Sequence, residues 1–497
     1  MPAARSSFLG EALTHNAAIS ARSLSSMCVI IMEGSSSPPW PPLSPYCRGG
    51  GGWGGREGGG RQSSYPPYRQ QHLPPSTDEE MDERSPYDRV LYGLHHDPRW
   101  LKEVTLGRRV GFYRFRGELG QGNFSTVRLA VHQLTRDKVA IKVIDKSKLD
   151  QKTQRMLARE IANMDTLAHP NIIRLFEVVE SLSRIHLVLE FAGGGELFNT
   201  ITTEGRMTEA QAAAVFTQVL SAITYLHGLS IIHRDIKAEN VFVSGPGHVK
   251  LGDFGFSTRV SDLEQQLSTF CGSPPYAAPE LYKDESYLGP AVDTWALGVL
   301  LFFILTADMP FKAPTVAGLK RHILTGVYET PSHVSPEAAS LISSLLVQDP
   351  SERPTTATIA DHPFLSDAPA PPPPLDPYVL APTFDSTPDV NESEALQTLS
   401  EWGITRNNLQ DNIPLGARSP ALATYRILIH RLTTPAPLHL TSLSAPPQAT
   451  HQLSSDPSTP IKETAATASP RRRLKLRNGH APVSLSPGVK SRACVIV

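Results

Sequence analysis

Cysteine is scarce in this chain of 497 residues, and the few cysteines present are not grouped. The four of them are Cys28, Cys47, Cys271 and Cys494, and no two have a paired spacing. This excludes a disulfide framework and a cysteine-rich zinc site, since both need cysteines at short, repeated intervals. The pattern fits a reducing compartment, and we expect a cytoplasmic protein.

A strong excess of charge and long apolar runs are also lacking. The formal net charge is −1, so the chain as a whole has no bias toward nucleic acid or membrane. We expect a monomer without a nucleic-acid partner. The longest apolar run, at 296–307, has about half to two-thirds of the length that a bilayer crossing requires. We interpret it as a buried helix.

Proline and glycine are plentiful, with 44 and 35 residues, and they crowd the two ends of the chain. Ser-Pro-Pro clusters and a glycine-rich run make residues 1–95 low in complexity, which predicts a disordered N-terminus. A proline run predicts a linker at 366–392. One large domain at 113–365 precedes this linker. A small helical module at 393–432 and a disordered basic tail at 433–497 follow it.

Hydrophobic periodicity changes once within the large domain. Apolar alternation at 127–131 and 139–144 and a short apolar run at 186–190 predict strands. Helical periodicity occurs at 152–167 and then dominates, at 210–226, 292–305, 316–324 and 338–346. The sequence therefore predicts an α+β fold in which a strand-rich lobe is followed by a helix-rich lobe.

The clearest chemistry lies in one short segment and the tripeptide that follows it. The segment reads His233-Arg234-Asp235-Ile236-Lys237-Ala238-Glu239-Asn240, and Asp253-Phe254-Gly255 comes thirteen residues later. Phosphoryl transfer needs such a set, because its catalysis is mostly positioning and charge neutralisation. We expect Asp235 to orient the acceptor hydroxyl and take its proton. Asn240 and Asp253 would bind Mg²⁺, and Lys237 would neutralise the transferring phosphate.

A glycine-rich loop between two predicted strands is the candidate phosphate cradle. Glycine lets backbone amides approach phosphates closely, where a side chain would clash. The strand-to-strand context differs from the strand-to-helix context of a dinucleotide site. The residues expected at the nucleotide from this loop are Gly120, Gln121, Gly122, Asn123, Phe124, Ser125 and Val127. Ser125 stands where a third glycine is common.

Residues after the loop complete the candidate nucleotide site. Lys142, preceded by Ala140 on its strand, would grip the α- and β-phosphates, and Glu160 on the next helix is its expected counter-ion. The peptide that contains Glu190 and Ala192 would offer backbone groups to adenine. Glu196 would reach the ribose or a basic substrate side chain; the alternative is that it only starts a helix. With Glu239, it could favour a basic residue upstream of the acceptor.

These motifs resemble the eukaryotic protein-kinase superfamily across residues 113–365. The segments 253–257 and 267–280 resemble the AMP-activated-protein-kinase-related group, and 103–107 and 148–155 resemble its new-inducer-of-mitosis type. The resemblance implies a bilobal protein-kinase fold, with ATP and Mg²⁺ as cofactors and protein substrates. In this family Lys237 marks a serine/threonine kinase. Glu280 is expected to pair with Arg353 as a structural clamp.

Thr269 is the candidate switch. It lies between Asp253 and the Ala-Pro-Glu element that ends in Glu280, and Arg234 precedes the catalytic aspartate. A phosphate on Thr269 could recruit the Arg234 guanidinium and order the loop. In the resembling group an upstream activating kinase of the liver-kinase-B type phosphorylates this threonine. The alternative is a substrate-loop threonine without a switching role.

Two features lie beyond the large domain. The module at 393–432 resembles the ubiquitin-associated-like module of related enzymes, which docks on the catalytic lobes; a free-standing helix pair is the alternative. The tail has seven Lys/Arg between Arg471 and Arg492 and ends in Cys494-Val495-Ile496-Val497. That ending has the shape of a prenylation box and, with the basic residues, predicts membrane association. An unmodified basic tail is the alternative.

The leading hypothesis is an active, ATP-dependent serine/threonine protein kinase. A pseudokinase scaffold that acts through its flanks predicts the loss of Lys142, Asp235 or Asp253, and all three are present. A small-molecule phosphotransferase is disfavoured by the element that ends in Glu280, which together with the loop before it serves a protein acceptor in the resembling family.

Overall fold

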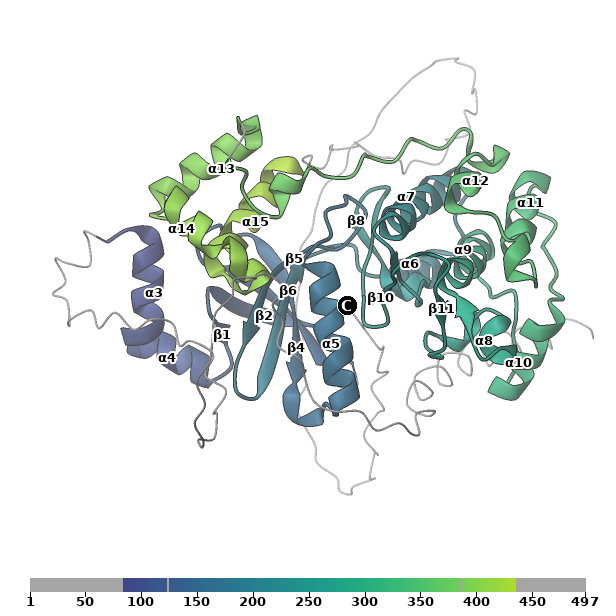
Figure 1. Cartoon of the computed structure of the whole chain (residues 1–497), viewed down its shortest axis with the longest axis horizontal. Helices are drawn as coiled ribbons and strands as arrows, with labels where there is room; N and C mark the ends of the chain where they lie inside the picture. The colour runs from purple at the N-terminus through teal and green to yellow at the C-terminus, as the bar shows by residue number, and fades with distance from the viewer. Residues whose placement is uncertain (1–83, 123–124, 385–386, 435–497) are drawn as a thin grey trace, which may run out of the picture. The chain divides into compact units, whose positions relative to one another are not determined.

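The structure is a computed structural model that describes residues 84–122, 125–384 and 387–434. The predictions for Asn123, Phe124 and Cys494, for the basic tail and for residues 1–83 concern parts of the chain outside these ranges. A strand-rich lobe and a helix-rich lobe follow one another along the described chain, as the sequence predicts (Figure 1). The fold is the α+β, bilobal protein-kinase fold.

The strand-rich lobe is built on one six-stranded antiparallel sheet with the order β1-β2-β3-β4-β6-β5. Its strands are β1 (Arg109–Val110), β2 (Tyr113–Gln121), β3 (Ser125–His132), β4 (Lys138–Asp145), β5 (Leu175–Glu180) and β6 (Arg184–Glu190). Side chains alternate between the two faces of a strand. On β4, Ala140 and Ile144 therefore join the core that contains α5 (Gln151–Met164), while Val139 and Ile141 belong to a separate apolar cluster on the other face.

The helix-rich lobe is built around one largely apolar helix. This helix, α9 (Gly289–Thr306), is long and apolar enough to cross a membrane by composition, but 83% of it is buried inside the protein. It is therefore a core helix, as expected for the run at 296–307. The surrounding helices are α6 (Leu197–Glu204), α7 (Glu209–Gly228), α8 (Glu280–Lys283), α10 (Val316–Thr325), α11 (Pro336–Leu345) and α12 (Thr356–Ala360).

Three small antiparallel strand pairs carry the loops of this lobe. They are β8 (Val241–Gly245) with β9 (His248–Leu251), β7 (Ile231–Ile232) with β10 (Thr258–Arg259), and β11 (Gln266–Leu267) with β12 (Tyr287–Leu288). The loop at 233–240 starts directly after β7, and Asp253 follows β9 by two residues. The strand pairs therefore hold both ends of the predicted catalytic segment.

The predicted disorder of residues 1–95 is wrong for its last part. Two helices, α3 (Pro86–His96) and α4 (Pro98–Thr105), precede the sheet (Figure 1). The side chains of Ser85 and Asp97 cap them, and each cap is followed by a proline, the usual start of a helix. Val90 of α3 is buried in the cluster on the outer face of the sheet, so tertiary packing stabilises a segment whose composition suggests disorder.

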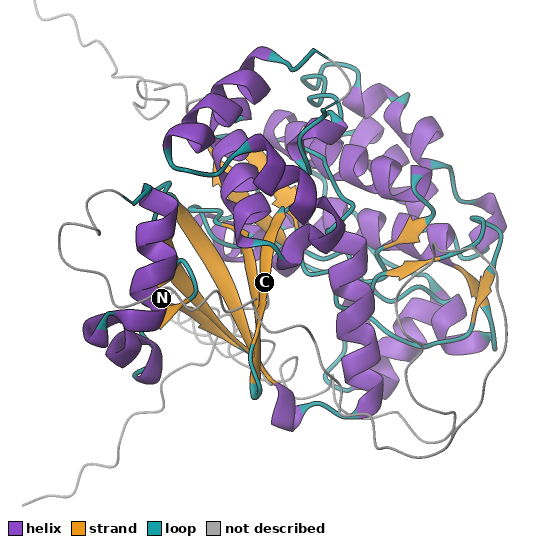
Figure 2. Cartoon of the chain, turned by 60° about the vertical axis from the view of Figure 1, so that its left-hand side comes forward, coloured by secondary structure: helices purple, strands orange, loops and turns teal. Residues whose placement is uncertain are grey.

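The C-terminal module consists of three helices that pack on the strand-rich lobe. They are α13 (Val390–Glu401), α14 (Arg406–Asn412) and α15 (Pro420–Thr433). Ile427 of α15 joins the outer-face cluster, and Arg426 forms an ion pair of 2.7 Å with Asp165, just after α5. Figure 2 shows these helices close to the strands. The helices are thus docked on the kinase lobe, not free-standing.

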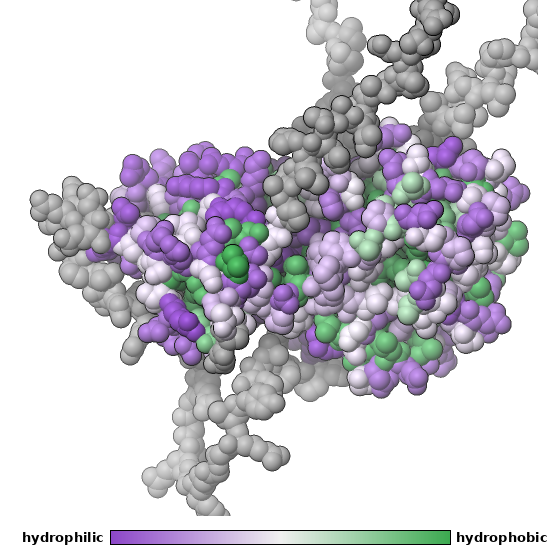
Figure 3. All heavy atoms as spheres, turned by 90° about the horizontal axis from the view of Figure 1, so that it is seen from above, coloured by the Kyte–Doolittle hydropathy of each residue, from purple (hydrophilic) through white to green (hydrophobic). Residues whose placement is uncertain are grey.

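The proline-rich segment before the module does not act as a free spacer in its second half. The Leu375 amide donates to the Ala168 carbonyl at 3.2 Å, and the Val379 carbonyl accepts from the Arg174 guanidinium at 2.8 Å. These contacts bind the segment to the strand-rich lobe. On the face seen in Figure 3, hydrophobic side chains form small separate groups among hydrophilic ones.

Buried Glu177 makes the stability of this lobe dependent on pH. Its carboxylate accepts a hydrogen bond of 2.6 Å from the Tyr113 hydroxyl, and burial raises the pKa of Glu177 from 4.5 to about 7. Since the folded state holds the proton more tightly, stability falls as pH rises from about 4.5 to about 7. We expect Glu177→Gln to raise the free energy of unfolding at pH 8 by up to about 3 kcal/mol.

The effect should vanish near pH 4.5, where the carboxyl is protonated and resembles the amide. Thermal unfolding of both proteins across this range measures it, with exposed Glu329→Gln as the control. A constant difference between variant and wild type at every pH would contradict the titration of Glu177.

Candidate active site

A buried carboxylate fixes the backbone of the loop at 233–240. Asp293 of α9 accepts hydrogen bonds from the amides of His233 (3.0 Å) and Arg234 (2.8 Å), and its other contact is the His227 ring at 2.9 Å. Burial opposes the charge of Asp293, but these hydrogen bonds and the charges of the histidines keep its pKa below 3.8. Arg234 adopts a left-handed conformation with φ of 65°. Asp293 thus orients the two residues that precede the predicted base, Asp235.

Asp235 lies in a triangle with Lys237 and Ser273. The Lys237 ammonium is 2.8 Å from Asp235 Oδ2, and the Ser273 hydroxyl donates to Asp235 Oδ1 at 2.8 Å. Lys237 also donates to Ser273 Oγ at 2.9 Å. Burial disfavours the ammonium, but Asp235 more than offsets it and raises the pKa of Lys237. A charged lysine therefore stands beside the carboxylate that would receive a proton.

Ser273 is a site residue that the sequence interpretation missed. It reaches Asp235 because Gly272 lets the chain pass close to the catalytic loop. Gly272 has φ of 97°, and a Cβ there would lie 2.6 Å from the Arg234 carbonyl oxygen. The Gly-Ser pair at 272–273 lies in a segment that resembles the kinase family, and this pair could have pointed to Ser273 as a site residue.

Asn240 and Asp253 fit the predicted magnesium site. The Asn240 side-chain amide donates to the Asp235 carbonyl (2.8 Å) and Oδ2 (3.0 Å), which turns its Oδ1 away. That oxygen is buried and has no hydrogen-bond partner among the described residues. Buried polar atoms rarely stay unpaired, so the atom is suited to a ligand.

No group of three or more His, Cys, Asp or Glu side chains in the described ranges could hold a metal by itself. This is compatible with Mg²⁺, which proteins bind through one or two carboxylates together with substrate phosphates and water. Asp253 and Asn240 supply that kind of incomplete oxygen set.

Lys142 connects the sheet to α5 and to Asp253. Its ammonium lies 3.2 Å from Glu160 and 3.3 Å from Asp253. Burial opposes the charge, but the two carboxylates outweigh it and raise the pKa of Lys142. Burial alone would raise the pKa of Asp253, but the charges of Lys142 and Lys237 outweigh it and lower this pKa. The lysine thus stays charged in a buried position, as a phosphate ligand must.

The glycine-rich loop is the turn between β2 and β3. Gly120 pairs with Val127 and Gln121 with Thr126, and the Gly122 amide donates to the Ser125 carbonyl at 2.8 Å. Val127 and Ala140 are buried on the face that also carries Lys142. Val127 pairs directly with Lys142, so the row of Gly120 and Val127 lies on the face of the sheet that carries the lysine, whereas Gln121 lies in the next row.

In the peptide between the lobes, the side chain of Glu190 is already engaged, which leaves its backbone for a ligand. The Glu190 carboxylate receives the Lys250 ammonium at 3.0 Å and lies 3.3 Å from the His430 ring of α15. Burial opposes its ionisation, but Lys250 and His430 lower the pKa of Glu190. Sequence reasoning did not foresee the module's contact through His430, because nothing local links residues so far apart. Ala192 follows at half-buried exposure.

Glu196 lies close enough to Glu239, in the loop at 233–240, for the two carboxylates to repel each other. Each has one side-chain oxygen that is buried and without a hydrogen-bond partner among the described residues. Burial and the charge of Glu239 raise the pKa of Glu196 to about 7, although Lys237 opposes the shift. Glu196 also starts α6, so the helix-start alternative and the ligand hypothesis are compatible.

Thr269 is exposed, and Arg234 reaches it only through Tyr287. The Arg234 guanidinium donates to the Tyr287 hydroxyl at 3.2 Å, and that hydroxyl donates to the Thr269 carbonyl at 2.7 Å. Sequence reasoning named Thr269 and Arg234 but not Tyr287. The expected clamp is present as well, since Arg353 donates to both Glu280 oxygens at 2.6 and 2.8 Å.

Comparisons with known proteins agree with this geometry. A family model described as "Protein kinase domain" matches residues 113–365. The chain belongs to the protein kinase family. This kinase is also similar to rat serine/threonine-protein kinase SIK1, with 38% identity over 324 residues that cover 65% of this chain and 42% of the relative. The mouse protein of the same name is 38% identical over 333 residues, with the same coverage. The matches thus span about two fifths of each relative.

Proposed function

We propose that this kinase phosphorylates serine and threonine residues of protein substrates with ATP and Mg²⁺, as a member of the AMP-activated-protein-kinase-related group. One observation carries the proposal: Asp235 is held between Lys237 and Ser273, beside the free Oδ1 of Asn240. The similarity to rat and mouse serine/threonine-protein kinase SIK1 supports the acceptor class. The new-inducer-of-mitosis type remains our finer proposal, based on residues 103–107 and 148–155.

In this proposal each charged group has one task. ATP supplies the phosphoryl group, and Mg²⁺ held by Asn240 and Asp253 supplies charge neutralisation. Asp235 orients the acceptor hydroxyl and takes its proton. Lys237, fixed by Asp235 and Ser273, neutralises negative charge beside the acceptor. Lys142 holds the nucleotide phosphates, and Glu160 keeps the lysine in place.

The acidic pair of Glu196 and Glu239 supports a basic substrate residue. Their unpartnered buried oxygens would be satisfied by a guanidinium or ammonium group, which donates several hydrogen bonds. Such a substrate cation would also relieve the repulsion between the two carboxylates. We therefore propose that substrates carry Arg or Lys upstream of the phosphorylated residue.

An arrayed peptide library with labelled ATP tests the proposal. We expect wild type to phosphorylate Ser and Thr peptides but not Tyr peptides, and to prefer those with upstream Arg. Glu196→Gln should reduce kcat/KM for Arg peptides by about tenfold, the worth of one charge-assisted contact. Because the carboxylate must be ionised to attract Arg, wild-type preference should also fall as pH drops below about 7.

Exposed Glu204→Gln, at the end of α6, is the matched control and should leave the preference unchanged. Peptides without Arg should show little of the pH dependence. Equal turnover of Arg and Ala peptides by wild type would refute the preference alone, whereas transfer to Tyr peptides or to none would refute the acceptor class.

The proposal also covers how the kinase is activated and where in the cell it acts. We infer that an upstream kinase activates the protein at Thr269, which is exposed and connected to Arg234 through Tyr287. The scattered cysteines support a cytoplasmic protein, and we propose that it acts as a monomer. Lipidation at Cys494, with membrane association through the basic tail, stays a prediction from the sequence.

A further inference from the structure

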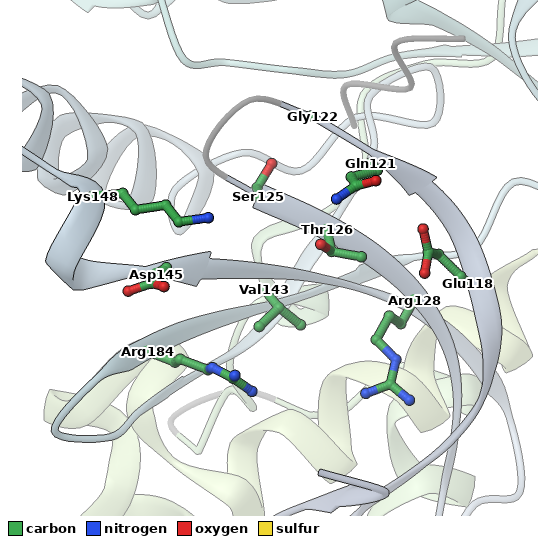
Figure 4. A pocket seen from close by; sticks show the side chains of 10 residues that line it. All are labelled: Glu118, Gln121, Gly122, Ser125, Thr126, Arg128, Val143, Asp145, Lys148 and Arg184. Atoms are coloured by element: carbon green, nitrogen blue, oxygen red, sulfur yellow. The ribbon is translucent and has the colours of Figure 1, made fainter. Parts of the chain in front are cut away.

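The outer face of the sheet, which α3 and α15 cover in part, also has a groove. Its cavity measures about 360 Å³. Figure 4 shows its lining, which comes from β2, β3, β4, β6 and the turn after β4. Arg128 pairs with Ile141, Thr126 with Val143 and Asp145 with Arg184, so these three rows stand at every second position along β4. Alternate rows share a face, so Arg128 and Arg184 both project on the outer side.

The lining of this groove carries more positive than negative charge, with Arg128, Lys148 and Arg184 against Glu118 and Asp145. Neither Arg128 nor Arg184 forms an ion pair within the described part of the chain. Asp145 is engaged by Ser147, whose amide and hydroxyl donate to it at 3.0 and 2.6 Å. Burial and the charge of Arg184 lower the pKa of Arg128, with Glu118 opposing. Lys148 adds a third cation, so an anion would find several donors.

Exposed aliphatic side chains lie at both ends of the groove. At one end Arg128 donates to the Gly107 carbonyl at 2.8 Å, which brings the end of α4 beside it. Leu101, Val104 and Leu106 on and after this helix are 43%, 44% and 54% exposed. At the other end, Leu182 in the turn before Arg184 is 101% exposed.

The helix α4 itself has the composition of an interfacial helix. It has no buried residue, and exposed Lys102 lies beside its apolar stripe, one turn from Arg99, which pairs with Asp97 at 3.1 Å. Its acid, Glu103, is already engaged by Arg109 and Arg114 at 3.0 and 2.9 Å. A helix with aliphatic residues on one side and cations next to them binds at the boundary of lipid headgroups and acyl chains.

We propose that this surface, formed by α4, the groove and the β5–β6 turn, binds anionic phospholipid membranes. The cations face headgroup phosphates, and Leu101, Val104, Leu106 and Leu182 insert at shallow depth. Charge complementarity favours lipid as the occupant. Four separate aliphatic side chains suit shallow insertion better than a protein interface, which needs a contiguous buried area of about 1,000 Å². The site is independent of the predicted lipidation at Cys494.

Co-sedimentation of the full-length, unlipidated protein with vesicles tests the proposal. We expect partitioning onto phosphatidylcholine vesicles that contain phosphatidylserine and little onto phosphatidylcholine alone. The double variant Leu101→Glu, Val104→Glu should lower the partition coefficient by about tenfold or more. Arg184→Gln should lower it by about fivefold, and the loss should shrink at high salt.

Val327→Glu and Arg206→Gln, which alter an exposed valine and an exposed arginine of the helix-rich lobe, are matched controls and should partition like wild type. Every variant keeps the same basic tail. The thermal midpoint and the turnover of a soluble peptide should be unchanged, which separates lost binding from lost folding. Equal partitioning of all variants, or equal binding to both vesicle types, would overturn the proposal. So would Arg184-dependent binding of a phosphoserine peptide with unchanged vesicle partitioning, which would assign the groove to a phosphorylated protein.

Discussion

Asp235→Asn should abolish nearly all phosphoryl transfer while leaving the fold and nucleotide affinity intact. Loss of the proton acceptor costs about a hundredfold to ten-thousandfold in general base catalysis. For Asp235→Asn we expect a loss of activity at the upper end of this range, because Lys237 would also lose its ionic partner at 2.8 Å. We expect kcat to fall about a thousandfold or more, with nucleotide binding changed less than about twofold.

The decisive measurement is kcat with labelled ATP and an excess of peptide, beside nucleotide binding by calorimetry. Exposed Asp361→Asn is the matched control for the change of charge. Ser273→Ala should have a smaller effect, since it removes one of the contacts that orient Asp235 and leaves the carboxylate. An Asp235→Asn enzyme that keeps a tenth of wild-type kcat would show that another group takes the proton.

Thr269→Ala should produce the second-largest loss, through the activation loop. With a hydroxyl at this position, Arg234 reaches the loop only by way of Tyr287. A phosphate would offer charged oxygens directly to the guanidinium, and such pairs order activation loops. For the variant purified from cells, we expect peptide turnover about a hundredfold or more below that of wild type. This is the size of effect expected when phosphorylation no longer orders the activation loop.

Ser268→Ala, at the adjacent exposed position, is the matched control and should retain activity. Phosphatase treatment of wild type should reproduce the loss, and treatment of Thr269→Ala should change nothing further. Nucleotide affinity should stay the same, because Lys142 and Glu160 are already paired at 3.2 Å. Full turnover by the purified alanine variant would exclude the switch.

The sequence predicted most of the fold because its strongest signals are local. The strand at 139–144 and the helices at 210–226 and 292–305 each became an element within a few residues of the predicted bounds. The site residues Lys142, Glu160, Asp235, Asn240 and Asp253 lie together for a different reason. They were recognised through spacing within motifs, and that spacing carries the tertiary information that local periodicity lacks.

What the sequence did not predict depends on contacts between distant segments. Helix α3 lies in a stretch whose composition suggested disorder, and it is stabilised by burial of Val90 against the sheet. Ser273 and Tyr287 act through geometry that only the folded loop creates. The proline-rich segment was read as a spacer because no local feature reveals that Arg174 would bind the Val379 carbonyl at 2.8 Å.

The docking of α15 changes where the smallest autonomous folding unit ends. Ile427 is part of the same buried cluster as Phe176 and Val188 of the sheet. The matched family region, 113–365, leaves out both this helix and α3. A fragment cut at those limits would expose one face of the sheet. It would also leave the buried guanidinium of Arg174 without the Val379 carbonyl that accepts its hydrogen bond. The catalytic domain of this kinase should therefore be expressed from the N-cap of α3, Ser85, to the C-cap of α15, Thr434.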